Sequence, residues 1–355
     1  NQDQSKGNEK RIHFRIISGS STNCETKAAL EQEIDYQPLT EFHATVAPDD
    51  FLLSRFRAYL GQLDPHPKVA LLAETNSGYS NAFQRKLRPK KQNAADGTPD
   101  SCTAQEAIAD NWLVLPFPMY ISQLRSAYEK TQGPVQPTES PNPVTNPARP
   151  TLSVPLSESQ DAIDVPSAFT PGMTTGIVDL DLQNLLSTIS REGRNYVGLL
   201  ATDTRDKLFL AKQINKYCPD VRLFTFDSDL LYTHPDFNSY LNGMIVVSSY
   251  PLFSRNQIWT SASESSRNRR LQFPMQQTEG IYNAALALLD YTAEGALMPG
   301  GRTLIEYSQP FGDSAAATAT TPAVWITVVG HGASWPLKIY DDTPAKGADR
   351  KQSYL

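Results

Sequence analysis

The chain has 355 residues, of which 39% are hydrophobic and 20% are charged, and its formal net charge is −6 at pH 7. This length and composition are typical of a globular protein with one large core or two domains of ordinary size. The acidic balance argues against a nucleic-acid partner, because phosphate binding needs clustered Lys and Arg side chains. No apolar run reaches the roughly 20 residues of a membrane helix, so we expect no membrane span in this chain.

The first predicted elements surround a loop of small polar residues. Residues 1–10 are polar, and we expect them to be disordered. Residues 11–17 alternate partly between polar and apolar and predict a strand that enters the loop SGSSTN at residues 18–23. The stretch from Asp49 to Leu60 predicts a helix, because its apolar residues fall near helical spacing and its acidic residues lie at the N-terminal end, where the helix dipole favours them.

The stretch 69–83, VALLAETNSGYSNAF, predicts a buried strand, a loop and the start of a helix. Consecutive apolar residues suit a strand covered on both faces, which is typical of a parallel sheet between helices. In such sheets ligands bind beyond the carboxyl ends of the strands. The loop from Glu74 to Ser80 is therefore a candidate binding loop, although most loops of this kind bind nothing.

Further strands and helices alternate along the rest of the chain. We predict strands at residues 112–115, 196–201, 222–226, 243–248 and 323–329, and helices at residues 120–130, 178–189, 205–216 and 277–290. A segment rich in Pro, Ser and Thr at about 133–176 predicts an insertion outside the core, and residues 341–355 predict a mobile tail. The alternation predicts a doubly wound α/β fold, a mostly parallel sheet with helices on both faces.

Several segments carry a more specific pattern when they are taken in order. The motif I-S-x-x-x-T-N occupies residues 17–23 and is followed by FHATVAPDD at residues 42–50. Then come LLAETNSGYS, VDLDLQNLLSTI, YVGLLATDTRDK, NGMIVVSSY and EGIYNAALALL. This series, over roughly residues 11–289, resembles the type I periplasmic binding fold, the leucine/isoleucine/valine-binding-protein family of extracellular ligand-binding receptors.

The resemblance implies two lobes, of which the first is largely absent. In the family well over a hundred residues precede the first motif, and here almost none do. Residues 11–43 would be a remnant of the first lobe, residues 44–250 the second lobe with its insertion, and residues 251–340 a return segment. We interpret such a chain as a fragment of a longer protein or as a divergent relative. A second departure is the order Gly78-Tyr79, where the family has Tyr-Gly.

The resemblance also implies candidate ligand-binding residues, since the family holds its ligand between the lobes. Small hydroxyl residues and amides bind a carboxylate there, and an acidic residue binds an amino group. The matching positions are Ser20, Thr22, Tyr79, Thr202, Asp203, Asp227 and Asp229. Each also has an ordinary structural interpretation, since the hydroxyl residues can stabilise a turn, the tyrosine can pack and Asp203 can cap the helix that follows.

Catalytic and metal-binding patterns are weaker. His331 follows a strand in the tripeptide GHG, but no G-x-S-x-G turn supplies a nucleophile for an α/β hydrolase or transferase. The chain has no Walker phosphate loop and no GxGxxG, its five histidines lack metal-ligand spacing, and its three cysteines are widely spaced. We therefore predict no catalytic residue, no cofactor and no metal.

Two functions remain open from the sequence. The first is a non-enzymatic ligand-binding or sensing domain for a small polar molecule, such as an amino acid or a small carboxylate. The second is a structural or protein-interaction module on the same fold, within a larger chain or assembly. The resemblance implies an extracytoplasmic location, either periplasmic or membrane-anchored through a segment not present in this chain.

Overall fold

The computed structural model describes residues 14–21, 40–75, 77, 80, 83, 112–118, 121–132, 156, 175–252, 272–289 and 322–340. The predicted disordered start, the predicted tail and nearly all of the predicted insertion lie outside these residues. Within the described part of the chain, every helix is too short or too polar to cross a membrane.

A seven-stranded sheet is the centre of the fold, with the strand order β4-β3-β5-β6-β7-β8-β9. The strands from β4 to β7 are parallel, whereas β8 and β9 are antiparallel to their neighbours. The strands are β3 (Val69–Glu74), β4 (Leu113–Phe117), β5 (Tyr196–Leu200), β6 (Arg222–Thr225), β7 (Ile245–Ser248), β8 (Val324–Gly330) and β9 (Ala333–Tyr340). The predicted mixed α/β fold with a mostly parallel sheet is confirmed.

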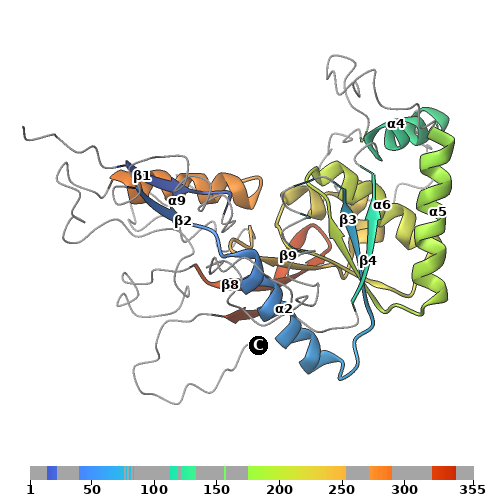
Figure 1. Ribbon diagram of the computed structural model, residues 1–355, viewed down its shortest axis with the longest axis horizontal. Helices are drawn as coiled ribbons and strands as arrows, with labels where there is room; N and C mark the ends of the chain where they lie inside the picture. Colours follow the sequence, from blue (N-terminus) through green and yellow to red (C-terminus); the bar gives the residue numbers. More distant parts are fainter. Residues whose placement is uncertain are drawn as a thin grey trace, which may run out of the picture.

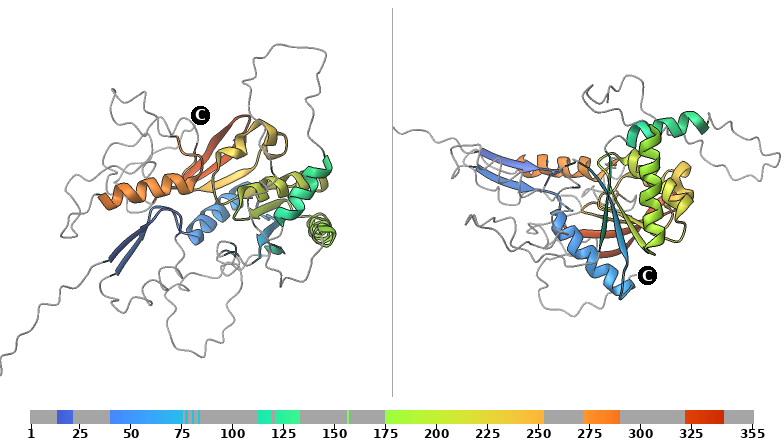
Figure 2. Two further views of the ribbon diagram at one scale, coloured as in Figure 1. Left: turned by 90° about the horizontal axis from the view of Figure 1, so that it is seen from above. Right: turned by 45° about the vertical axis from the view of Figure 1, so that its right-hand side comes forward.

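Helices cover both faces of this sheet (Figures 1 and 2). Helix α2 (Asp49–Leu63) packs on one face, where Leu53, Phe56 and Leu60 are fully buried. The other face is covered by α4 (Ile121–Gln132), α5 (Thr175–Arg191), α6 (Thr204–Tyr217) and α7 (Pro235–Leu241). The central strands β3 and β5 are buried along their whole length because both of their faces are covered.

The structure differs from the sequence predictions in several elements. The 3-10 helix η2 (Leu230–Thr233), α7 and β9 were not predicted. Helix α5 begins at Thr175, inside the predicted insertion, and Leu156 of the same segment is buried in the core, where its backbone N–H donates to the Glu129 carboxylate at 2.5 Å. The prediction that this whole segment stays outside the core is therefore wrong at Leu156.

A smaller unit lies beside the large sheet, at the left of Figure 1. It consists of the parallel strands β1 (Phe14–Ser18) and β2 (Thr40–Ala44) and of helix α9 (Gln276–Leu289), which contacts β1. Two glycines permit this contact. A Cβ atom on Gly19 would lie 2.2 Å from the backbone nitrogen of Ile281, and one on Gly280 would lie 2.0 Å from the Gly19 carbonyl oxygen. The backbones of the loop and the helix therefore touch.

We expect Gly19→Ala to disrupt this contact, because the atoms that the new methyl group would meet are backbone atoms of α9 and cannot rotate away. A loss of about 1–3 kcal/mol in the free energy of unfolding is expected for such overpacking. Urea denaturation of the variant measures it. Gly61→Ala is the matched control, since among the described residues no atom outside the adjoining turns of α2 lies within 4 Å of the added Cβ. Equal stability of the two variants would contradict the close packing of β1 on α9.

Candidate functional site

The sheet has a topological switch point between β3 and β5. The chain leaves β3 to form β4 on one side and leaves β5 to form β6 on the other, so the connections diverge there. Such a divergence opens a crevice at the carboxyl ends of the two strands, where ligands bind in this class of sheet. Glu74 ends β3, and Thr202 follows β5.

These two residues close the crevice with a direct contact. One Glu74 carboxylate oxygen accepts hydrogen bonds from the Thr202 backbone N–H at 2.8 Å and from the Thr202 hydroxyl at 2.7 Å. Glu74 is buried, whereas Thr202 is exposed. The candidate loop that begins at Glu74 therefore starts at the switch point. Most of the loop, including Tyr79, lies outside the described residues.

Asp203 organises the start of α6. Its carboxylate accepts a hydrogen bond from the Arg205 backbone N–H at 2.8 Å and so caps the helix. The same carboxylate forms ion pairs with Arg205 at 3.0 Å and with the buried Arg125 of α4 at 3.4 Å. Arg125 also pairs with Asp206 at 2.7 Å. Asp203 thus has the capping role that the sequence left open, and one third of its side chain remains exposed.

The two aspartates differ in pKa because their surroundings differ. Burial acts to raise the pKa of Asp203, but the hydrogen bonds from Arg205 and the charges of Arg125 and Arg205 outweigh it and hold that pKa below its usual range. The pKa of Asp206 is raised to about 7, first by burial and then by the nearby Asp203 and Glu74, against the opposing charges of Arg125 and Arg205. The start of α6 therefore contains a carboxyl group that is hard to ionise.

A buried ion pair lies next along the carboxyl edge. The Lys207 ammonium lies 2.5 Å from both carboxylate oxygens of Asp227, and only 2% of the Lys207 side chain is exposed. Asp227 also accepts a hydrogen bond from the Thr225 hydroxyl at 2.9 Å. The charges compensate each other inside the protein, so Asp227 is tied to the scaffold.

Asp229 connects β6 to the smaller unit. Its carboxylate accepts hydrogen bonds from the Thr204 hydroxyl and from the Leu231 backbone N–H, both at 2.8 Å. Burial raises its pKa, although these two hydrogen bonds and Lys207 oppose the rise. Its backbone pairs with Met275, immediately before α9. The N-terminus of α9 therefore lies against the carboxyl end of β6.

Glu279 lies in the first turn of α9, near this junction. Its side chain is fully buried, and neither carboxylate oxygen has a hydrogen-bond partner among the described residues. Burial raises the pKa of Glu279 to about 8. No pattern in the sequence selects this residue, because an acidic residue in the first turn of a helix is usually exposed and favoured by the helix dipole. Its burial arises from packing between segments that are far apart in the chain.

The two segments that pass between the units are linked beside Glu279. The Thr45 hydroxyl donates to the Gly280 carbonyl at 2.7 Å, and the Tyr250 hydroxyl donates to the Thr45 carbonyl. Asn283 of α9 donates to the Tyr250 hydroxyl at 3.1 Å. These bonds join the segment before α2 and the segment after β7 to one helix, so movement of α9 would be transmitted to both.

We call the carboxyl groups along this edge the acidic row. Its members lie at the carboxyl ends of β3, β5 and β6 and on α9. Among the described residues, fewer basic side chains than acidic ones lie beside them. The acids are Glu74, Asp203, Asp206, Asp227, Asp229 and Glu279, and the cations are Arg125, Arg205 and Lys207. An excess of carboxyl groups over cations in a partly buried region favours a positively charged ligand group, such as an ammonium.

The structure thus brings four of the candidate residues to one edge of the sheet: Thr202, Asp203, Asp227 and Asp229. Ser20 is exposed in the turn after β1, next to the Gly19 contact with α9, and its backbone N–H lies 3.4 Å from the Ser18 hydroxyl oxygen. Thr22, like Tyr79, lies outside the described residues. Ligand contact stays a prediction for all seven.

The described residues contain no metal-binding cluster, and His331 and Cys218 lie apart from the acidic row. None of the described residues form a group of three or more His, Cys, Asp or Glu side chains that could hold a metal ion. His331 is exposed in the turn between β8 and β9, at a distance along the chain from every member of the acidic row. Cys218 is buried as a free thiol, and Cys24 and Cys102 lie outside the described part of the chain.

No protein-family model and no curated protein sequence matches this chain. Among the solved structures similar to it is a branched chain amino acid ABC transporter periplasmic ligand-binding protein from Burkholderia xenovorans. The two chains are 10% identical, the alignment covers 92% of this chain and 76% of that chain, and the TM-score is 0.44. A branched chain amino acid ABC transporter protein from Thermus thermophilus with bound valine has 10% identity, coverage of 93% and 78%, and a TM-score of 0.44.

A third similar structure is a solute binding protein from R. palustris in complex with 4-hydroxybenzoate. It has 10% identity, coverage of 88% of this chain and 70% of that chain, and a TM-score of 0.39. At this identity the likeness concerns the fold alone. The resemblance to type I periplasmic binding proteins rests on the order of the sequence motifs.

Proposed function

We propose that this chain is a non-enzymatic ligand-binding or sensing domain for a small polar molecule that carries an ammonium group, such as an amino acid. The ligand would bind where the loop after β1, the acidic row and the N-terminus of α9 meet. Ser20 and Thr22 would bind its carboxylate, and Asp203, Asp229 and Glu279 would surround its ammonium.

Glu279 is the observation that carries this proposal. A buried carboxyl group without a hydrogen-bond partner among the described residues destabilises the fold, because its desolvation is not compensated. An ammonium group that enters beside it would supply both a charge and hydrogen-bond donors. The carboxyl group would then ionise at neutral pH, and the ligand would gain a charge-assisted hydrogen bond in a region of low dielectric.

The hydrogen bonds around Glu279 supply a route from binding to a signal. Thr45 and Tyr250 lie on the two segments that pass between the units, and both are linked to α9. A ligand that pulls α9 toward β6 would shift these segments together. Closure of the smaller unit on the large sheet is therefore the conformational change that we propose for this domain.

The test is a thermal-shift titration with three matched sets of compounds. The first are amino acids such as L-valine and L-leucine. The second are the corresponding carboxylic acids without the amine, and the third are the corresponding amines without the carboxylate. A ligand that binds only the native state raises the melting temperature with its occupancy. We expect a saturable rise with an amino acid, a smaller one with the amine and none with the acid.

The diagnostic variant is Glu279→Gln, which we expect to abolish the ligand-induced rise. Asp181→Asn is its matched control, because Asp181 is an exposed acid of α5 outside the acidic row. An unchanged ligand response in Glu279→Gln would refute the assigned role of Glu279. Absence of any shift across the panel, with the protein folded, would refute the ligand-binding function itself.

A second candidate function is a protein-interaction module on the same fold. It is favoured by apolar side chains exposed along α9, where Ile281 is 57% exposed and Leu288 is 52% exposed. The two residues are seven positions apart and lie on one side of the helix, as in a packed helix pair. Sedimentation of wild type and Ile281→Lys distinguishes this function, since association through α9 would be lost in the variant.

We further propose that residues 11–43 are a remnant of a first lobe and that residues 44–250 form the second lobe. Residues 251–340 would be the return segment that follows the second lobe. The pairing of β1 with β2 and the contact of β1 with α9 support a division of this kind, whereas β8 and β9 belong to the large sheet. An extracytoplasmic location, periplasmic or membrane-anchored, accords with the resemblance.

A further inference from the structure

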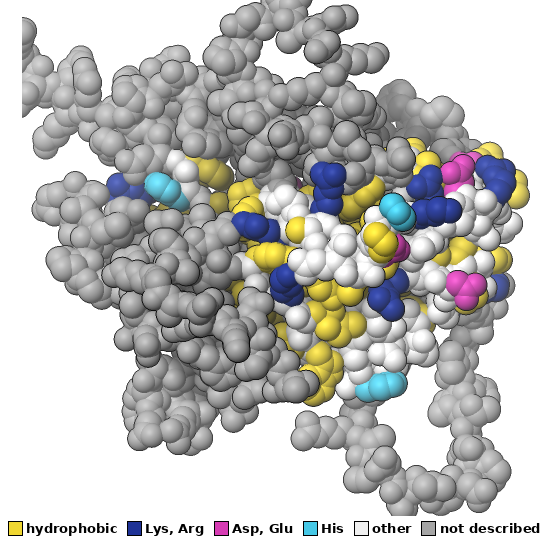
Figure 3. Space-filling model, turned by 90° about the horizontal axis from the view of Figure 1, so that it is seen from below, with side chains coloured by type: hydrophobic (Ala, Val, Ile, Leu, Met, Phe, Trp, Pro, Cys, Tyr) yellow, Lys and Arg dark blue, Asp and Glu magenta, His cyan; other side chains and the backbone are white. Residues whose placement is uncertain are grey.

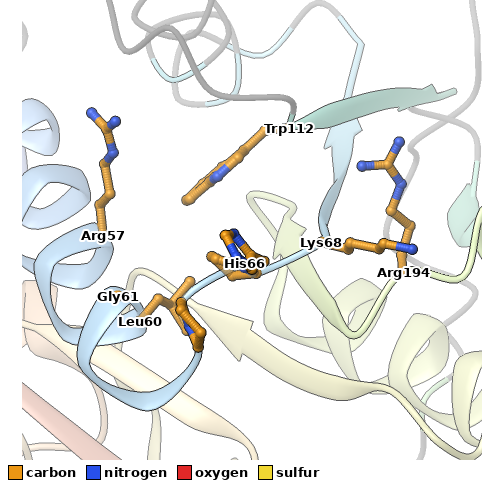
Figure 4. A pocket seen from close by; sticks show the side chains of 9 residues that line it. Arg57, Leu60, Gly61, His66, Lys68, Trp112 and Arg194 are labelled. Atoms are coloured by element: carbon orange, nitrogen blue, oxygen red, sulfur yellow. The ribbon is translucent and has the colours of Figure 1, made fainter.

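A pocket lies at the amino ends of β3, β4 and β5, on the edge of the sheet opposite to the acidic row. Its volume is about 480 Å³, and we call it the amino-edge pocket. It is lined by Arg57 and Leu60 of α2, by His66 and Lys68 of the loop before β3, by Trp112 before β4 and by Arg194 before β5. Figure 4 shows these side chains around the opening.

The pocket concentrates positive charge in an acidic protein. The basic residues Arg57, Lys68 and Arg194 line it and come from three separate segments. The Lys68 ammonium is exposed and has neither a hydrogen bond nor an ion pair with any described residue. In Figure 3 Lys and Arg side chains gather among apolar ones on the face seen from below, where the amino ends of the strands lie. The amino-edge pocket is thus rich in basic side chains, whereas the acidic row at the carboxyl edge is rich in carboxyl groups.

Arg194 is held in position rather than free to move. Its guanidinium donates to the Val69 carbonyl at 3.4 Å and forms an ion pair with Glu192 at 2.9 Å, and its side chain is only 14% exposed. The Lys68 carbonyl accepts hydrogen bonds from the backbone N–H groups of Asn195 at 2.9 Å and Tyr196 at 3.2 Å. The segments that carry the two cations are therefore bonded to each other, and the site needs little reorganisation before binding.

Trp112 supplies an aromatic wall beside these cations. Its ring packs edge-on against Phe56 at a centroid distance of 6.5 Å and against Phe224 at 6.2 Å. These contacts fix the indole at the boundary of the core, and it faces His66 across the pocket (Figure 4). A fixed aromatic face that borders a polar opening suits stacking by a planar ring of a ligand.

We propose that the amino-edge pocket binds a small phosphate ester that carries a planar ring. The phosphate would lie between Lys68 and Arg194, and the ring would stack on Trp112. A dianion matches the local excess of cations, since a phosphate group accepts several charge-assisted hydrogen bonds at once. The site is independent of the proposed function at the acidic row, from which strands of five or six residues separate it by roughly 17–20 Å.

The test is calorimetric titration of the full chain at constant ionic strength with phenyl phosphate, inorganic phosphate and phenol. We expect phenyl phosphate to bind most tightly, inorganic phosphate to bind more weakly and phenol not to bind. Lys68→Gln removes the exposed cation and should weaken phenyl phosphate binding by about tenfold or more. Trp112→Leu should weaken phenyl phosphate binding but change inorganic phosphate binding little.

One further variant and a folding check complete the design. Lys216→Gln is the matched control, because Lys216 is an exposed lysine of α6 outside the pocket, and it should bind phenyl phosphate like wild type. Melting curves show whether each variant is folded. The proposal is overturned if phenyl phosphate does not saturate the protein, if Lys68→Gln binds it like wild type, or if phenol binds as tightly. Equal affinity for phenyl phosphate and inorganic phosphate would overturn the assignment of the ring to Trp112.

Discussion

Lys207→Met is expected to lower the free energy of unfolding by about 3–5 kcal/mol, because it leaves the Asp227 carboxylate buried without its counter-charge. The ammonium lies 2.5 Å from both carboxylate oxygens, and Asp227 is itself only 7% exposed, so water cannot replace the lost partner. Urea denaturation at neutral pH measures the loss. Because both side chains lie at the carboxyl edge, the result also shows how strongly the acidic row is tied to the scaffold.

Two comparisons separate the buried charge from the loss of a lysine. Lys216→Met removes an exposed lysine of the same helix and should change the stability by no more than about 0.5 kcal/mol. The double variant Lys207→Met with Asp227→Asn removes both charges and should recover more than half of the loss. A single variant Lys207→Met as stable as Lys216→Met would show that the pair contributes nothing.

Glu279 is expected to make the stability of the ligand-free protein fall as the pH rises. Its pKa is raised from 4.5 to about 8, so the folded protein holds a proton there that the unfolded chain has already released. The stability is then greatest below pH 4.5, decreases between that pH and about 8, and is constant above it. At about 1.4 kcal/mol per pH unit the decrease due to this one group is roughly 4–5 kcal/mol.

Glu279→Gln has no such proton to release, so its stability should show a shallower decrease over the same pH range. Burial also raises the pKa of Asp206 and Asp229, so these residues lower the stability of both proteins as the pH rises. The difference in stability between wild type and Glu279→Gln therefore isolates the effect of Glu279. Urea denaturation of both proteins at several pH values from 5 to 9 measures this difference. Parallel curves for the two proteins would mean that Glu279 ionises normally and is not buried as described.

These two predictions depend on contacts that no local sequence pattern contains. Lys207 lies in the polar and charged start of a helix, and Glu279 is an acid in the first turn of another. By sequence, either would be placed at the surface, as most lysines and glutamates are. Their burial results from the way α6 and α9 are packed against strands and segments that are far away in the chain.

The order of elements could be predicted from the sequence because it depends on local periodicity. The apolar runs of β3 and β5 predicted strands buried on both faces, and the helical spacing of residues 49–60 predicted α2. The family resemblance placed Asp203, Asp227 and Asp229 in loops that follow strands, and parallel strands end at one edge of a sheet. The strand β9 was missed because none of its eight residues is fully buried and it contains Pro336, so only its pairing with β8 makes it a strand.

The sequence by itself determined the class of the fold, because strand and helix alternation follows from local periodicity. Tertiary structure alone decided which acids of the acidic row are paired, which one is buried without a described partner, and which cations meet at the amino-edge pocket. Arg57, Lys68, Trp112 and Arg194 are separated by as many as 137 positions in the sequence. Their meeting depends on strand order and helix packing, which are set by contacts between distant residues and by no pattern within one segment.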